Sequence, residues 1–253
     1  MSSLNSSTSN PQGAPGPVGA GPGAAVDSAV DARPFVSGLD QAASRYILAV
    51  LHHPFMRELA DGSLSDERFV YFLVQDHHFL QSAARAFSQV VSRIKDDEWL
   101  VHFNQCSTEV LVLEKSVHSR YFERFGLTLQ TVSVAKVAPT NEGYSCYLEN
   151  LADRADFSQA LCALLPCFWF YRDVARHMLS MPSLHERFRA WAEFYGGEAY
   201  DALVESLLDL VEEVAADASA SARESMRSRF VHSARYEWMF WEMCYHMECW
   251  PEP

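Results

Sequence analysis

The sequence lacks long apolar runs and is poor in basic residues. No run approaches the ~20 apolar residues that a membrane-spanning helix needs. Only 20 Lys and Arg residues stand against 33 Asp and Glu residues, which gives a formal net charge of −13. A surface this negative repels the phosphates of nucleic acids and of anionic lipids. We therefore expect neither a membrane nor a nucleic acid as a partner.

Motifs of several common enzyme classes are also missing. The chain has no glycine-rich phosphate loop and no GxSxG motif. The stretch SLHERFRA does not match the zinc-binding HExxH motif, because Arg189 occupies the position of the second histidine. These absences argue against phosphate-loop, serine-hydrolase and HExxH zinc enzymes.

The histidines and acids do not form a complete metal-binding pattern. The adjacent pair His77-His78 would point to different faces of a helix. Glu114 and His118 are four residues apart and would share a face, but a di-metal site in a helical bundle needs a second such motif. We expect no metal and no cofactor. A metal- or haem-dependent enzyme on a helical scaffold stays as the alternative that this pair motivates.

Six cysteines are present, and their context favours reduced thiols. The chain is too long for a disulfide-stapled small protein, and no signal peptide is recognisable at its start. Two pairs are spaced five residues apart, which does not stack them on one helix face. We therefore expect a cytoplasmic protein with free thiols. The six residues are Cys106, Cys146, Cys162, Cys167, Cys244 and Cys249.

Two regions of different composition divide the chain. Residues 1–34 consist mainly of Ser, Gly, Pro and Ala without periodicity, so we expect a disordered tail. Residues 35–253 carry helical periodicity almost throughout, with Ser65 and Asp96 or Asp97 as N-caps. The composition of residues 127–143 is β-like, but this stretch is short, and we expect a loop. The prediction is one all-α domain of about eight helices, near 39–53, 65–94, 96–125, 143–154, 157–178, 183–194, 198–216 and 219–249.

Two carboxylates interrupt faces that are otherwise apolar. Asp76 lies on a helical face formed by Phe69, Phe72, Leu73, Phe79, Leu80 and Ala83. Glu237 interrupts a second face, formed by Phe230, Ala234, Trp241 and Cys244. Burying an ionised carboxylate without partners is very costly, so each acid needs hydrogen-bond donors or a ligand. A neighbouring Arg or Tyr would supply donors without any catalytic role, and both interpretations stay open at this point.

A third unusual feature is the stretch ALLPCFWFY at residues 163–171. Pro166 removes a helical hydrogen bond and is expected to bend the helix next to a thiol, Cys167. Tyr171 follows four residues later and therefore shares a face with Cys167. A buried cysteine is often inert, and a nucleophile needs an activating partner. Tyr144 and Tyr195 stand near element ends, where their hydroxyls suit either a binding site or the edge of the core.

Five sequence blocks together resemble the TenA/thiaminase II family. They are FVYFLVQDHHFL, YSCYLENLA, ALLPCFWFYRDVA, WAEFYGG and FVHSARYEWMFWEMCYHMECW, in the order and spacing of the family. The resemblance covers about residues 53–250 and excludes the predicted tail. It implies a heme-oxygenase-like helical bundle, usually a homotetramer, that encloses an aminopyrimidine. It also implies cofactor-free hydrolysis of thiamin or of aminomethylpyrimidine, which releases hydroxymethylpyrimidine for thiamin salvage.

The resemblance also assigns roles to residues at matching positions. It makes Cys167 of LPCFW the nucleophile, Glu237 of YEW the proton-transferring acid, and Asp76 of VQD the carboxylate that recognises the amino group and supports the thiol. The substrate-binding residues it implies are Tyr144, Tyr171, Tyr195 and Phe79, the last at a position where the family often has Tyr. The remaining alternative to an enzyme is a non-catalytic pyrimidine-binding or regulatory bundle.

Overall fold

The computed structural model describes residues 33–182 and 184–252, without the side chains of residues 106, 107, 109–118 and 187. This part of the chain consists of helices and connecting loops, with no strand. The helices are α1 (Pro34–Leu51), α2 (Pro54–Asp61), α3 (Asp66–Val91), α4 (Asp97–Arg124), α5 (Leu129–Ser133), α6 (Pro139–Arg154), α7 (Phe157–Ser180), α8 (Glu186–Tyr195), α9 (Glu198–Ala216) and α10 (Ala220–His246). The predicted all-α class is therefore confirmed. No helix in the described part is long and apolar enough to cross a membrane.

Polar side chains start three of the long helices, α3, α4 and α10, where the sequence predicted. The side chains of Ser65 and Asp96 accept hydrogen bonds from the third backbone amides of α3 and α4. Ser219 does the same for α10. Each cap satisfies an amide that lacks a partner in its own helix. Such a cap typically stabilises a protein by about 1 kcal/mol.

Two short helices, α2 and α5, were not predicted. The first predicted helix ends at residue 53, but Pro54 is the first residue of α2, whose N-cap His53 accepts from the Phe55 amide through Nδ1. The prediction of a loop over 127–143 is wrong in part. It contains α5, which Thr128 and Thr131 start with a reciprocal capping box, and Pro139 opens α6. Proline fits a first helical turn, where its missing N–H has no partner to lose.

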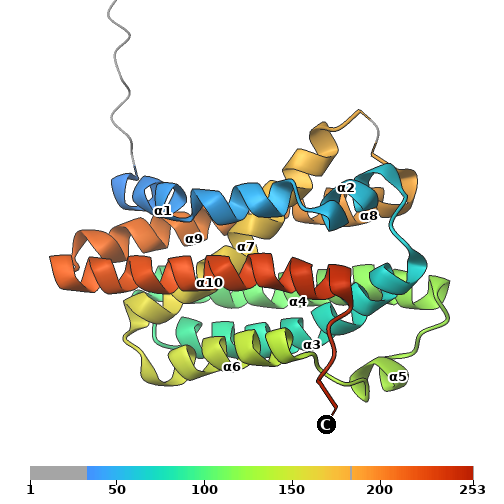
Figure 1. Cartoon of the computed structure of the whole chain (residues 1–253). Coiled ribbons are helices and arrows are strands. Elements are labelled where there is room, and N and C mark those ends of the chain that lie inside the picture. Colours follow the sequence, from blue (N-terminus) through green and yellow to red (C-terminus); the bar gives the residue numbers. More distant parts are fainter. Residues whose placement is uncertain (1–32, 183, 253) are drawn as a thin grey trace, which may run out of the picture. The chain divides into compact units, whose positions relative to one another are not determined.

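Helix α7 lies at the centre of the packing. It contacts α10 most extensively and also packs against α1, α3, α6, α8 and α9. Figure 1 shows α1 running alongside α10, and α3 alongside α6. The most apolar part of α7, residues 160–167, is buried without interruption. The buried side chains of α7 are therefore presented to several other helices.

The predicted tail and domain boundary stay a prediction. Residues 1–32 lie outside the described residues. The last two residues of the predicted tail, Arg33 and Pro34, are the N-cap and the first residue of α1. The helical region therefore starts at the predicted boundary or slightly before it.

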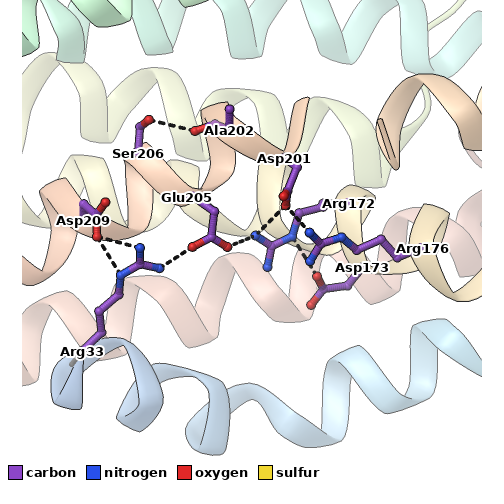
Figure 2. A network of polar contacts seen from close by, with 9 residues as sticks. All are labelled: Arg33, Arg172, Asp173, Arg176, Asp201, Ala202, Glu205, Ser206 and Asp209. Carbon is purple, nitrogen blue, oxygen red and sulfur yellow. Dashed lines mark hydrogen bonds and ion pairs between the residues drawn. The ribbon is translucent and has the colours of Figure 1, made fainter. Parts of the chain in front are cut away.

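An ionic network centred on the buried Arg172 joins α7 to α9 and to the start of α1, as Figure 2 shows. The Arg172 side chain is 6% exposed and lies 2.6 Å from Glu205 and 3.5 Å from Asp201. Arg33 extends the network, with 2.6 Å contacts to Glu205 and to Asp209. The Arg hydrogen bonds outweigh the desolvation of Glu205 and hold its pKa below the usual value. Glu205 is therefore ionised and serves the packing of these helices.

Candidate active site

The two predicted carboxylates lie inside the protein, and each accepts a hydrogen bond from a tyrosine. Asp76 on α3 is 0% exposed, and its Oδ1 accepts from the Tyr171 hydroxyl on α7 at 3.0 Å. Glu237 on α10 is 1% exposed, and its Oε1 accepts from the Tyr144 hydroxyl on α6 at 2.7 Å. Four predicted site residues from four helices thus form two acid–tyrosine pairs. Tyrosine donors are neutral, so the pairs contain no cation that would hold the acids ionised.

Glu237 is set up to carry a proton at neutral pH. Burial raises its pKa, and the charge of Asp76 raises it further, while the hydrogen bond from Tyr144 lowers it. The sum places the pKa of Glu237 at about 8. A carboxyl group with this pKa is largely protonated at pH 7, and it suits general acid catalysis.

The two tyrosines stay neutral donors. Burial is the main reason that the pKa values of Tyr144 and Tyr171 lie well above the usual value. The charge of Glu237 and an electrostatic interaction with Cys167 add to this effect at Tyr144. This interaction places Cys167 near Tyr144, and so brings the predicted nucleophile into the same cluster.

Cys167 is one of three buried cysteines in the described part, with Cys162 and Cys244. Its helix continues through Pro166, and its thiol donates to the Leu164 carbonyl at 2.8 Å. Burial raises the pKa of Cys162 and of Cys244, which favours the unreactive thiol. All three are free cysteines, as are Cys146 and Cys249, so the expectation of free thiols is confirmed for the five. Cys106 lies outside the described side chains.

Aromatic rings surround Tyr171. The ring of Tyr195, the third predicted tyrosine, meets it edge-on at a centroid distance of 5.2 Å. Trp191 and Trp241 pack at 6.0 and 5.6 Å and were not predicted as site residues. Their sequence positions held a signal, because Trp191 lies four residues before Tyr195 and Trp241 four residues after Glu237. Both are therefore on the same helix faces as predicted site residues.

Phe79 lies against the second acid–tyrosine pair. Its ring stacks on Tyr144 at 4.9 Å with an interplanar angle of 27°. Tyr236 stacks on the other side of Tyr144 at 4.9 Å and 6°. The Tyr144 ring is thus held between two aromatic rings, with its hydroxyl on Glu237. Phe79 brings an apolar edge where a tyrosine would bring another hydroxyl.

The metal alternative gains no support from the described side chains. They contain no group of three or more His, Cys, Asp or Glu residues arranged to hold a metal ion. The side chains of Glu114 and His118 lie outside the described residues. His53 uses Nδ1 to cap α2, so this nitrogen is engaged in structure.

A heme-oxygenase-like helical bundle with a buried thiol, two acids and three tyrosines is the class that this fold and site define. A solved domain from Shewanella denitrificans, described as having a heme oxygenase-like fold, is similar with a TM-score of 0.65 and 15% identity, covering 87% of this chain and 94% of that one. A TenA homologue from Pyrococcus furiosus is similar with a TM-score of 0.77 and 19% identity, covering 83% of this chain and all of that one. These likenesses establish the fold.

The sequence comparison then gives the family. The model of the TENA/THI-4/PQQC family matches residues 40–247, and the chain belongs to this family. A curated relative is the aminopyrimidine aminohydrolase of Halalkalibacterium halodurans, 27% identical over 218 residues that cover 85% of this chain and 97% of the relative. The resemblance seen in the five blocks is confirmed.

Proposed function

We propose that this protein is an aminopyrimidine aminohydrolase of the thiaminase II type. It hydrolyses the bond at the exocyclic methylene of an aminopyrimidine and releases hydroxymethylpyrimidine for thiamin salvage. The observation that carries the proposal is the buried Glu237, which accepts a hydrogen bond from Tyr144 and whose pKa is raised to about 8, with Cys167 close to the same tyrosine. A thiol and a carboxylic acid in one water-poor cluster suit covalent addition to a ring with simultaneous protonation. Family membership and the aminohydrolase relative support the same reaction.

The proposed reaction uses three side chains and one water molecule. Cys167 transfers its proton to Asp76, and its sulfur forms a bond to a ring carbon while Glu237 protonates a ring nitrogen. The electron-rich ring then expels ammonia from the protonated aminomethyl group of aminomethylpyrimidine, or the neutral thiazole from thiamin, at the methylene carbon. Water adds to this carbon and releases a proton. The carbon–sulfur bond breaks, and Glu237 and Cys167 recover their protons. The ring itself accepts the electrons, so the reaction needs no cofactor.

The tyrosines orient the acids and the substrate in this proposal. Tyr171 holds Asp76, which recognises the amino group, and Tyr144 holds Glu237 toward the ring nitrogen. Tyr195 and Phe79 supply aromatic surface for a planar ring. The missing hydroxyl at Phe79 is expected to affect the choice between thiamin and aminomethylpyrimidine.

The test is product analysis by liquid chromatography. Purified protein is incubated separately with thiamin and with aminomethylpyrimidine, and hydroxymethylpyrimidine is quantified. We expect turnover of at least one substrate. If neither substrate is consumed, the proposed function is wrong, and a non-catalytic pyrimidine-binding bundle becomes the better explanation, which calorimetric titration with the same compounds would detect.

The assembly and location are part of the proposal. We infer a cytoplasmic homotetramer, because the family to which the chain belongs usually forms one. Light scattering on the purified protein is expected to give the mass of four chains, and a monomer mass would contradict this.

A further inference from the structure

A buried hydrogen-bond latch joins α3 to the start of α6. The Gln75 side chain accepts from the Ala138 amide at 3.0 Å and from Asn141 Nδ2 at 3.0 Å. Its own amide donates to the Lys136 carbonyl at 3.0 Å. Asn141 also donates to the Gln75 backbone carbonyl at 2.8 Å. Gln75 and Asn141 are 3% and 0% exposed, so the latch is shielded from water.

A second contact comes from the segment that follows α10, residues Met247–Trp250, which we call the strap. Met247 has a left-handed backbone conformation, with φ of 50°, and turns the chain away from the α10 axis. The strap then crosses to the start of α6, where Glu248 Oε2 accepts from the Thr140 amide at 2.9 Å. Tyr71 on α3 donates to the Glu248 carbonyl, and Trp250 donates to the Val137 carbonyl at 2.9 Å.

These contacts replace a local cap. The N-cap residue of α6 is Ala138, whose side chain cannot accept a hydrogen bond, and Pro139 follows it. The Ala138 and Thr140 amides are satisfied instead by Gln75 of α3 and Glu248 of the strap. The position of the first turn of α6 is therefore set by two distant segments of the chain.

The same first turn leads directly to the candidate active site. Tyr144 lies four residues after Thr140, on the same face of α6, and donates to Glu237. Gln75 is the residue before Asp76, so the latch joins the helix of one acid to the helix that carries the partner of the other. The strap in turn continues the helix that carries Glu237.

We propose that Gln75 and Glu248 are positioning residues, which fix the first turn of α6 so that the Tyr144 hydroxyl meets Glu237. The catalytic meaning of this inference rests on the proposed function, whereas the geometric part does not. Neither residue contacts the reacting atoms. Both act through Tyr144.

The groups that face Glu237 determine how its pKa should change when α6 is loosened. Tyr144 faces it from α6, Asp76 from α3, and Tyr171 lies within electrostatic reach on α7. Of these contacts, the Tyr144 hydrogen bond lowers the pKa of Glu237, while Asp76 raises it. Only Tyr144 belongs to α6. Where α6 shifts without admitting water to Glu237, the loss of the Tyr144 hydrogen bond therefore raises the pKa of Glu237 further above its present value.

The central variant is Glu248→Ala, because Glu248 is half-buried at the surface and its loss leaves the core intact. We expect kcat to fall about 5- to 20-fold, consistent with a small misplacement of a catalytic group. The high-pH limb of the rate profile should move to higher pH. Glu248→Gln keeps an acceptor oxygen for the Thr140 amide and should restore both readouts. Glu252→Ala removes an exposed acid from the same end of the chain and serves as the matched control.

A readout without activity separates this inference from the proposed function. The Glu237 carboxyl is titrated by ¹³C NMR in glutamate-labelled protein and assigned by its absence in Glu237→Gln. We expect a higher midpoint in Glu248→Ala than in the wild type and in Glu248→Gln. A wild type that hydrolyses no aminopyrimidine would refute the proposed function, and the titration would still decide the positioning role.

One result would contradict the positioning role of Glu248. If Glu248→Ala lowers Tm but leaves the Glu237 midpoint and the pH profile unchanged, Glu248 is only a structural cap. Gln75→Met removes the buried latch at similar side-chain volume and should shift the midpoint more than Glu248→Ala. If Gln75→Met does not fold, Glu248→Ala alone decides.

Discussion

Two neighbouring residues of α7 belong to two different charged regions, one buried and one partly exposed. Tyr171 points to Asp76 in the candidate active site, and the next residue, Arg172, binds Glu205 in the ionic network. Burial acts on the glutamate of each region. Glu237, which has a neutral tyrosine partner, has a pKa raised to about 8, mainly by desolvation. At Glu205, which has arginine partners, the Arg hydrogen bonds overcome the desolvation and lower the pKa.

The glutamates differ in partner and in burial, because Glu237 is 1% exposed whereas the Glu205 side chain is 42% exposed. A cation holds the carboxyl group ionised and uses it to join helices, whereas a hydroxyl partner in a dry interior leaves it protonated. A protonated carboxyl group can donate its proton in a reaction, whereas an ion pair holds helices together. The following changes test this assignment.

The largest expected effect is the loss of the thiol from the first region. Cys167→Ser should lower turnover at least ~100-fold, because a hydroxyl is a much weaker nucleophile than a thiol. Product analysis on both proposed substrates measures it. The control is Cys162→Ala, which alters a buried thiol on the same helix and should keep near wild-type turnover. An unchanged rate in Cys167→Ser would contradict the mechanism.

Glu237→Gln tests the proton on the acid and should lower turnover about 100-fold. It should also stabilise the protein at high pH. The folded-state pKa of about 8 lies above the usual 4.5, so the folded state binds more protons than the unfolded state between these values, and stability falls as pH rises through this window. Glutamine removes this loss and still accepts from Tyr144. Thermal unfolding at pH 5 and pH 9 measures the effect: the Tm advantage of the variant must appear at pH 9 and shrink at pH 5.

Arg172→Met tests the second region by removing the buried cation. We expect a loss of about 2 kcal/mol in the free energy of unfolding, below the range for a fully buried pair because Glu205 and Asp201 are partly exposed. The pH profile of kcat should keep its shape in the folded variant. Arg189→Met breaks the exposed pair with Glu186 and is the control, with an expected loss below about 1 kcal/mol. Denaturant titration measures both variants. If they lose equal free energy of unfolding, the Arg172 network stabilises the protein no more than an exposed ion pair does.

The smallest change, Tyr144→Phe, deletes one hydroxyl and keeps the ring between Phe79 and Tyr236. The pKa of Glu237 should rise above about 8, because the hydrogen bond that lowers it is lost. The high-pH limb of activity should therefore move upward, with kcat reduced about 10-fold by poorer orientation. Tyr147→Phe, on the same helix, should change neither quantity. A downward shift of the limb in Tyr144→Phe would show that the hydroxyl does not act on Glu237.

The sequence predicted the long helices well, because their signals are local. The Ser65 and Asp96 caps and the apolar stripes needed no knowledge of distant residues. The missed helices begin at Pro54 and just after Thr128, where a short-range pattern reads equally as a loop. Periodicity alone also indicated that Asp76 and Glu237 would be buried.

The partners of these acids could not be predicted in the same way. Asp76 and Tyr171 are 95 residues apart, and Tyr144 and Glu237 are 93 apart. Which tyrosine reaches which acid depends on how α3, α6, α7 and α10 pack, and no local pattern encodes this pairing. The raised pKa of Glu237 follows from the same packing. The family resemblance named these residues but not their contacts, and the roles that it assigns stay predictions.

The distant cap of α6 also has a consequence for the order of assembly during synthesis. The acceptor of the Thr140 amide, Glu248, is translated 108 residues later. A growing chain that has already made α3 and α6 still holds Tyr144 on a helix with an incomplete start, and Glu237 has not yet joined it. Contacts of such sequence separation form late. The acid–tyrosine pair is thus expected to be completed only when α10 and the strap dock, so a nascent chain remains inactive until its final helix is in place.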